Sequence, residues 1–203
     1  DRFEYLEALN MGTLEVEAFE KEDCEFGYRE SIFKHALKEE YVITSVVFRL
    51  FKKPRINTSY GAINEELQKM NVSEPSIKNV SDAVIAIRTS KLPDPKKLGN
   101  SGSFFKNPVI TNVQFLKIQS AYPEIAAYPV GDSHTKLAAG WLIDNAGWKG
   151  YTKGNYGVHK NQALVLVNYG GATGEEIYNL SNEIMLSIKT KYGIELEREV
   201  NVI

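Results

Sequence analysis

Apolar and polar residues alternate along several stretches of the chain, and this period of two predicts β-strands. In residues 13–19, Leu14, Val16 and Ala18 alternate with Glu15 and Glu17, which indicates a strand with one buried face. Residues 41–50 carry β-branched and apolar side chains on both faces, so we expect a more deeply buried strand there. Further strands are predicted at residues 162–168 and 194–203.

Helical spacing of apolar residues fills much of the remaining chain. In residues 173–192, Thr173 and Glu176 have the spacing of a capping box, and Gly193 follows as a stop. Shorter helices are predicted at residues 62–70, 76–90, 112–122 and 136–146. Because the helices and strands follow no regular βαβ order, the sequence predicts an α+β fold with an antiparallel sheet flanked by helices.

Residues 92–108 interrupt these patterns. The stretch is rich in proline and glycine, so we expect no regular element in it, only a linker or a working loop. We place a domain boundary near residue 92. The predicted parts are residues 1–91, residues 92–192 and a closing strand at residues 193–203.

Charge and cysteine content narrow the function classes. The chain has 24 basic and 26 acidic residues among 203, so we expect no nucleic-acid partner. Its apolar runs are too short to cross a bilayer, so we expect no membrane insertion. A single cysteine, Cys24, cannot form an internal disulfide, which favours a reduced, cytoplasmic protein. The three histidines lack metal-ligand spacing, so we expect no metal site.

The loop at residues 91–108 has the side chains of a phosphate-binding site. Gly99 and Gly102 permit close approach of backbone to a ligand, and Ser101 and Ser103 add hydroxyl groups. Positive charge comes from Lys91, Lys96, Lys97 and Lys106. The residues alone fit a plain surface connection as well, because short glycine patterns are weak motifs.

A family resemblance adds to this reading. The loop from Gly99 to Pro108, GNSGSFFKNP, resembles the signature loop of the UDP-N-acetylenolpyruvoylglucosamine reductases. Four more segments resemble blocks of that family in the same order: residues 24–34, 136–144, 157–168 and 196–200. The Tyr60 loop and the run KLPDP at residues 91–95 resemble the subgroup with a tyrosine-bearing insertion over the substrate.

The resemblance implies an FAD- and NADPH-dependent reduction in peptidoglycan synthesis. NADPH reduces the flavin, hydride passes to C3 of UDP-N-acetylglucosamine enolpyruvate, and protonation at C2 gives UDP-N-acetylmuramate. Ser103 matches the proton donor, and Arg29 and Glu199 match the residues that flank the substrate carboxylate. Without the resemblance, these would be a turn serine, a surface arginine and a solvent-facing glutamate. Arg198 and Asn201 depart from the family pattern and put Glu199 in some doubt.

The resemblance also implies a set of contacts to the UDP-sugar. Lysines suit a diphosphate, whereas aromatic and amide side chains suit uracil and ribose. Taken singly, Tyr60 fits a loop aromatic side chain packed on its own domain, and Lys149 fits a cation at the C-terminal end of a helix. The matching positions are Tyr60, Lys91, Asn107, Tyr128, Lys136, Lys149 and Gln162.

The resemblance gives each predicted part a role. Residues 1–91 match the remainder of a second FAD-binding lobe with the Tyr60 loop, residues 92–192 the UDP-sugar domain, and residues 193–203 a strand returning to the first lobe. We expect the main flavin-binding region to precede residue 1. The chain alone should then bind FAD poorly, lack turnover and self-associate through exposed apolar surface. The alternative is a stand-alone nucleotide-sugar binding module without catalysis.

Overall fold

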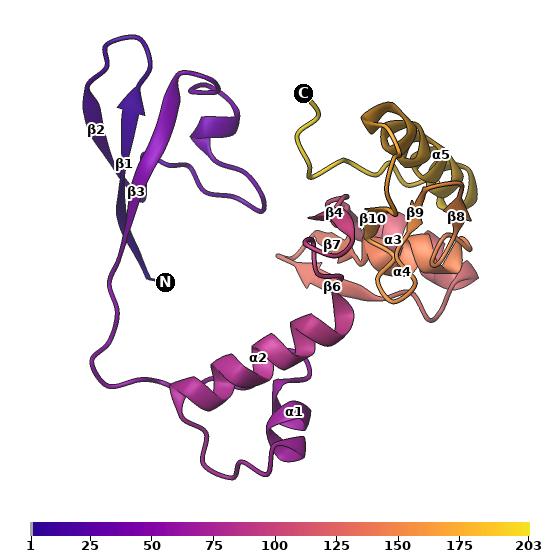
Figure 1. Ribbon diagram of the computed structural model, residues 1–203, viewed down its shortest axis with the longest axis horizontal. Coiled ribbons are helices and arrows are strands. Elements are labelled where there is room, and N and C mark those ends of the chain that lie inside the picture. The colour runs from indigo at the N-terminus through magenta and orange to yellow at the C-terminus, as the bar shows by residue number, and fades with distance from the viewer. Residues whose placement is uncertain (1) are drawn as a thin grey trace. The chain divides into compact units, whose positions relative to one another are not determined.

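A computed structural model describes residues 2–203 (Figure 1). The chain divides between Asn57 and Thr58 into two compact units, here called the first and second unit. The helices expected at residues 62–70 and 76–90 therefore share a compact unit with residues 92–203. The functional division near residue 92 stays a prediction.

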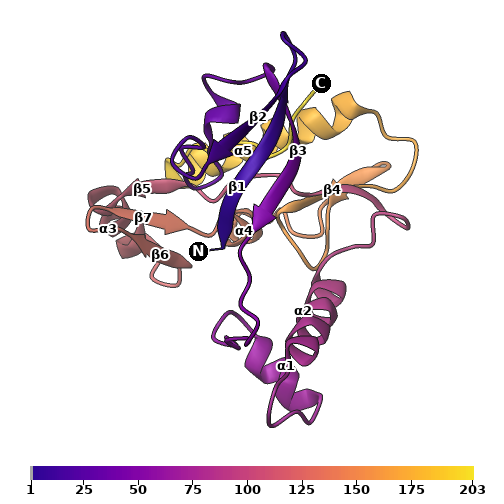
Figure 2. The same ribbon diagram turned by 90° about the vertical axis from the view of Figure 1, so that its left-hand side faces the viewer.

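The first unit is built on an antiparallel sheet of strand order β2-β1-β3 (Figure 2). Its strands are β1 (Phe3–Asn10), β2 (Val16–Glu20) and β3 (Tyr41–Phe48). Leu6 and Ala8 of β1 are buried together with Cys24. Rings of Phe19 and Phe33 pack edge-on nearby, with centroids 5.1 Å apart, so aromatic side chains complete this small core.

Strand β3 differs from its prediction as a deeply buried strand. It pairs with β1 on one side, and no second layer among the described residues of the first unit covers its apolar side chains. Val42, Ile43, Val46 and Phe48 are 43% to 58% exposed. The prediction was wrong because apolar residues on both faces of a strand favour burial but do not show whether the unit has a second layer to bury them.

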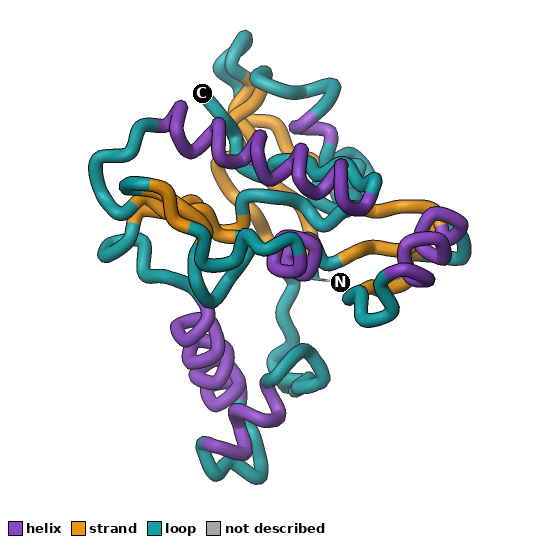
Figure 3. Tube along the Cα trace, turned by 90° about the vertical axis from the view of Figure 1, so that its right-hand side faces the viewer, coloured by secondary structure: helices purple, strands orange, loops and turns teal. Residues whose placement is uncertain are grey.

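The second unit contains two antiparallel sheets and most of the helices (Figure 3). One sheet has the order β4-β10-β9-β8, formed by Gly99–Ser103, Val165–Asn168, Tyr156–Val158 and Thr152–Lys153. The other has the order β5-β7-β6, formed by Val109–Thr111, His134–Leu137 and Ala127–Val130. Helices α3 (Asn112–Ala121), α4 (Ala139–Asn145) and α5 (Gly174–Tyr192) complete this α+β arrangement, as predicted.

Helix α5 supplies the main stripe of the core. Leu180, Ile184 and Ile188 are at most 1% exposed, and Leu142 and Ile143 of α4 belong to the same buried cluster. The helix begins with the predicted capping box of Thr173 and Glu176 and ends at Gly193, whose φ is 68°. The apolar stripe and the polar caps therefore fix this element from local sequence.

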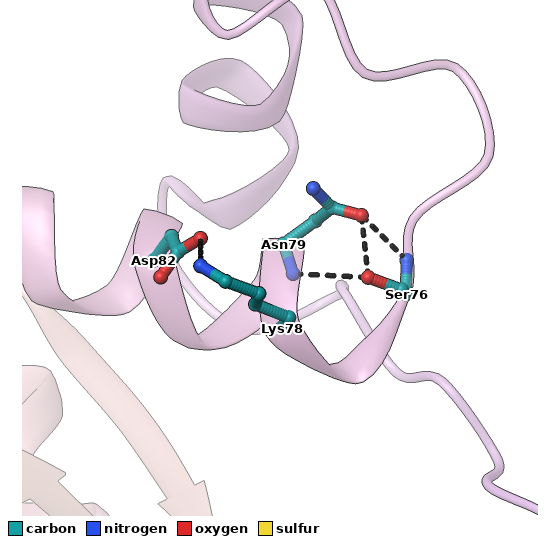
Figure 4. A network of polar contacts seen from close by, with 4 residues as sticks. All are labelled: Ser76, Lys78, Asn79 and Asp82. Carbon is teal, nitrogen blue, oxygen red and sulfur yellow. Dashed lines mark hydrogen bonds and ion pairs between the residues drawn. The ribbon is translucent and has the colours of Figure 1, made fainter.

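Helices α1 (Ile63–Lys69) and α2 (Ile77–Lys91) pack on each other through Ile63, Leu67 and Ala83. The start of α2 is a polar network (Figure 4). The Ser76 hydroxyl accepts from the Asn79 backbone N–H, and the Asn79 amide oxygen accepts from the Ser76 N–H at 2.9 Å. Lys78 pairs with Asp82 one turn on, at 2.6 Å. The predicted positions of both helices are thus confirmed.

Two loop predictions need correction. Gly99–Ser103, placed in an irregular stretch, forms strand β4 because β10 supplies a pairing partner that local sequence does not reveal. At Gly99 an added Cβ would lie 3.3 Å from the Asn168 carbonyl oxygen, so glycine permits this close pairing. Helix α4 begins at Ala139, not at residue 136, because Lys136 and Leu137 pair as strand β7 with β5 and β6.

The closing strand at residues 194–203 is also absent from the described strands. The segment makes one isolated bridge, between Phe105 and Arg198. Ile194 and Leu196 are nonetheless buried in the core of the second unit. The alternation therefore reflects packing on that core and not a full ladder of backbone hydrogen bonds.

Candidate functional site

The second unit has a cavity of about 1050 Å³ with an apolar and basic lining. The segment around α1 and α2 contributes one part of the wall, and residues 107–164 contribute the other. All the positions matched above to UDP-sugar contacts line this cavity: Tyr60, Lys91, Asn107, Tyr128, Lys136, Lys149 and Gln162. They come from seven different elements and loops, so their meeting here depends on the tertiary fold.

The sheet β5-β7-β6 positions two of these side chains together. Tyr128 of β6 and Lys136 of β7 are directly paired, so their side chains lie on the same face of the sheet. Asn107 is fixed by its amide oxygen, which accepts the backbone N–H of Ala139 at 2.9 Å. Because that oxygen caps the start of α4, the amide N–H₂ of Asn107 is left as the group to serve a ligand.

Lys149 is held by a neighbour that the sequence did not indicate. Its ammonium lies 2.5 Å from a carboxylate oxygen of Asp144, and both residues line the cavity. Asp144 is in the last turn of α4, and the chain then turns back through Gly147, which has a φ of 87°. A left-handed turn of this kind favours glycine and brings residue 149 back beside residue 144.

The charge of the cavity is strongly biased. Of the described lining residues, Arg88, Lys91, Lys136 and Lys149 are basic and Asp144 is acidic. A site with this excess of cations suits an anion carrying more than one charge. Sequence reasoning missed Arg88, Trp141 and Asp144, although the last two fall inside the family-like block at residues 136–144.

Ser103 lies at the end of β4, where the backbone is firmly anchored. Phe104 and Phe105, which follow it, are buried, and the Phe104 N–H donates to the Leu164 carbonyl at 2.8 Å. Gly102, with a φ of 73°, donates its N–H to the Asn100 side chain at 3.0 Å. Ser103 itself is exposed. An exposed hydroxyl on a fixed backbone is what a donor of protons to a bound ligand requires.

A second cavity, of about 610 Å³, is lined by Ser101 and Gly102 next to Ser103. Arg88 lines both this cavity and the larger one. The larger cavity and the Ser103 loop are therefore neighbours, connected around the C-terminal end of α2.

Glu199 reaches the same loop from the far end of the sequence. Its backbone N–H donates to the Phe104 carbonyl at 2.9 Å, and the Lys106 N–H donates to the Glu197 carbonyl at 2.8 Å. Arg198, one of the departures from the family pattern, donates to the Ser181 hydroxyl of α5 at 2.8 Å. Side chains of neighbouring residues in an extended segment point to opposite faces, so those of Arg198 and Glu199 lie in different surroundings.

Arg29 belongs to the first unit and lies in a tight turn. The Gly27 N–H donates to the Glu30 carbonyl at 2.9 Å, and Arg29 itself has a φ of 62°. Lys34 donates to the Arg29 carbonyl at 2.7 Å and holds the turn. A positive φ costs a non-glycine residue about 1 kcal/mol, so the surrounding contacts impose this conformation. The structure thus joins Ser103 and Glu199, whereas the approach of Arg29 to them stays a prediction.

Other reactive groups contribute little. Among residues 2–203, no group of three or more His, Cys, Asp or Glu side chains is placed to hold a metal ion. Burial, and then the charge of Asp23, raise the pKa of the Cys24 thiol, which disfavours a nucleophilic thiolate.

No helix in the described part of the chain is long and apolar enough to span a membrane.

Comparison with known proteins assigns the family. The model for the C-terminal domain of UDP-N-acetylenolpyruvoylglucosamine reductase matches residues 94–203, more than half of the chain. The chain belongs to this family. It corresponds to the C-terminal portion of such proteins.

Relatives agree over the whole chain. It is 55% identical to the UDP-N-acetylenolpyruvoylglucosamine reductase of Flavobacterium johnsoniae and covers 60% of that protein. It is 48% identical to the protein of that name from Amoebophilus asiaticus, over 99% of the chain and 59% of the relative. The chain therefore spans about three fifths of the length of these relatives.

A solved structure supports the fold. The crystal structure of UDP-N-acetylenolpyruvylglucosamine reductase from Thermus caldophilus aligns with a TM-score of 0.58 and 22% identity. The match covers 100% of this chain and 53% of that one. At this identity the likeness establishes the fold and leaves the site to be argued from its own residues.

Proposed function

We propose that the chain is the substrate-binding and proton-donating part of a UDP-N-acetylenolpyruvoylglucosamine reductase. The substrate would be UDP-N-acetylglucosamine enolpyruvate and the product UDP-N-acetylmuramate, for peptidoglycan synthesis in the cytoplasm. One observation carries the proposal: the residues matched to UDP-sugar contacts, scattered over about a hundred positions of sequence, line a single cavity. A cavity of about 1050 Å³ is also large enough for a nucleotide-sugar.

Different side chains of the cavity suit different parts of a nucleotide-sugar. Lys136 and Lys149 would pair with the diphosphate, and Tyr128 beside Lys136 would offer a ring and a hydroxyl. Trp141 in the same wall adds a flat surface suited to a base or a sugar face. Tyr60 is 84% exposed at the rim, so it is free to cover a ligand when one is bound.

We assign no residue of this chain to FAD. In residues 2–57 glycine occurs only at positions 12 and 27, so no glycine-rich loop is present to receive the diphosphate of the cofactor. A flavin reduced by NADPH and held elsewhere in a longer protein would supply hydride to C3 of the enolpyruvyl group. The disagreement between these residues and a flavin site is the reason we expect the chain alone to lack turnover.

This chain's residues would complete the reaction at C2. Arg29 would bind the substrate carboxylate through two parallel N–H groups and stabilise the negative charge that extends to it. The Ser103 O–H bond would then break as a C–H bond forms at C2. The serine oxygen would recover its proton from solvent, to which Ser103 is exposed. Glu199 would flank the substrate carboxylate together with Arg29.

A binding module without catalysis is the second candidate. It is favoured by the fact that the full set of matched sugar contacts lies within the second unit, whereas we assign no residue of the chain to FAD. Both candidates require the cavity to bind a UDP-sugar, and only the first requires Ser103.

Isothermal titration calorimetry of the chain with UDP-N-acetylglucosamine tests the binding step. We expect one site, and about tenfold or greater weakening in Lys136→Met because a charge-assisted contact is worth about 1.5–3 kcal/mol. Lys189→Met is the matched control, since Lys189 pairs with Glu195 on the surface and does not line the cavity. Absence of binding, or equal affinity in Lys136→Met, would contradict the proposal.

A further inference from the structure

Asp144 stands out among the groups that line the large cavity. It is the one acidic residue in the described lining. Its carboxylate forms an ion pair with the ammonium group of Lys149, with 2.5 Å between the oxygen and the nitrogen. Both side chains are partly open to solvent, with exposed fractions of 42% for Asp144 and 39% for Lys149. The lysine that we assign to the ligand diphosphate is therefore already bound to an anion of the protein.

The position of Asp144 in its helix is unfavourable for stability. It lies in the last turn of α4, where the carbonyl ends of the helix carry partial negative charge. A carboxylate there is unfavourable, and a basic residue is preferred. The helix already has a basic partner at this end, because Lys191 donates to the Asn145 carbonyl. Helix stability thus gives no reason for an acid at position 144.

We propose that Asp144 is an internal competitor for the diphosphate of the ligand. In the empty cavity its carboxylate takes the place of a phosphate oxygen on Lys149. When a nucleotide diphosphate binds, Lys149 turns toward the phosphate and the Asp144 carboxylate is left close to a second anion. This inference rests on the proposed function and adds to it a residue that limits affinity.

Electrostatics gives the direction of the effect. A carboxylate close to a diphosphate repels it in a partly solvated site, because two like charges there are only partly screened. Loss of the ion pair with Lys149 opposes binding as well, although an exposed pair of this kind contributes little. Both effects weaken binding, and both vanish when the carboxylate is removed. For an enzyme that must release a diphosphate-bearing product, a limit on affinity shortens the time that the product stays bound.

The effect should depend on the phosphates. Uridine has the base and ribose of UDP but no anionic group, so it has no charge for Asp144 to repel and no need of Lys149. Asp144→Asn should therefore tighten UDP binding and leave uridine binding unchanged. Asparagine keeps the size of the side chain, so the comparison isolates the charge.

Calorimetry with UDP and uridine, on the chain and on Asp144→Asn, tests this. We expect about tenfold tighter UDP binding in the variant, which equals ~1.4 kcal/mol, and a smaller gain when Lys149 is also replaced by Met. Glu183→Gln is the matched control, because Glu183 pairs with Lys153 at 3.5 Å outside the cavity. It should leave both affinities unchanged.

The outcomes separate the two proposals. UDP binding that is unchanged or weaker in Asp144→Asn would overturn the competitor role and make Asp144 a residue that positions Lys149. An equal gain for uridine would overturn it too, because the effect would then not concern phosphate. Failure of the unaltered chain to bind UDP at all would overturn the proposed function and the inference with it.

Discussion

At the scale of single residues, Gly157 is the position with the least room. A Cβ added there would lie 2.1 Å from the Tyr151 carbonyl oxygen and 2.9 Å from the Thr152 Cα, both of which are backbone atoms. Strand β9 approaches this turn so closely because the Val158 N–H donates to the Tyr151 carbonyl at 2.8 Å. Neither atom can move without breaking the β8–β9 pairing.

Gly157→Ala should consequently destabilise the second unit by about 3 kcal/mol or more, because overpacking against backbone forces the strand apart. Urea denaturation followed by circular dichroism measures the loss. Gly174→Ala serves as the control, since an added Cβ there meets nothing within 4 Å. Equal stability of the two variants would show that β9 is not packed as described.

Single residues also show how far sequence reaches. The positions matched to sugar contacts could be named because they lie in or near family-like motifs, and they line one cavity, whereas their contact with a sugar stays a prediction. Asp144 could not be named, because its pairing with Lys149 depends on the turn at Gly147. Arg88 lies on a helix at the edge of the motif region, and only the packing of α2 shows that it reaches the cavity.

At the scale of elements, the sequence predicted a helix or strand correctly where residues within that element determine its ends. Helix α5 was predicted with its ends because a capping box and a left-handed glycine act within one turn of chain. Strand β4 and the start of α4 were missed because pairing with β10, β5 and β6 decided them, and those partners are distant in sequence. The exposure of β3 depends on what covers a sheet, which a single strand's pattern does not contain.

Helix α5 offers a matched pair of substitutions. Ile184 is fully buried, whereas Leu186, two residues on, is 66% exposed. Ile184→Ala should cost about 2–5 kcal/mol through lost burial and a residual cavity, and Leu186→Ala within about 0.5 kcal/mol. Thermal and urea unfolding of both variants would check this. Similar losses would mean that α5 does not present the stripe described to the core.

At the scale of the whole molecule, the chain corresponds to the C-terminal portion of proteins in its family. The first unit exposes Val42, Ile43 and Val46, and self-association through this surface stays a prediction. The chain spans 60% of a relative from Flavobacterium johnsoniae, so the remaining length has room for a flavin site, and the assignment of FAD to that part stays a prediction.

The visible absorption spectrum tests this division. We expect the purified chain to carry no stoichiometric flavin and to retain none after incubation with FAD and gel filtration. The reason is the lack of a glycine-rich diphosphate loop in residues 2–57. A flavin band with one FAD per chain would contradict the assignment of the cofactor to another part of a longer protein.

The proton-donating role of Ser103 is the central chemical claim, and its test needs a flavin-bearing protein. A chimaera in which this chain replaces the matching 60% of the Flavobacterium johnsoniae relative provides one. The two half-reactions are then measured separately by stopped-flow absorbance: reduction of the flavin by NADPH, and its reoxidation by UDP-N-acetylglucosamine enolpyruvate with formation of product. We predict that Ser103→Ala keeps the rate of flavin reduction and lowers product formation by about 10²–10⁴-fold, the usual contribution of a positioned proton donor. Equal loss in both half-reactions, or unimpaired product formation, would contradict that role.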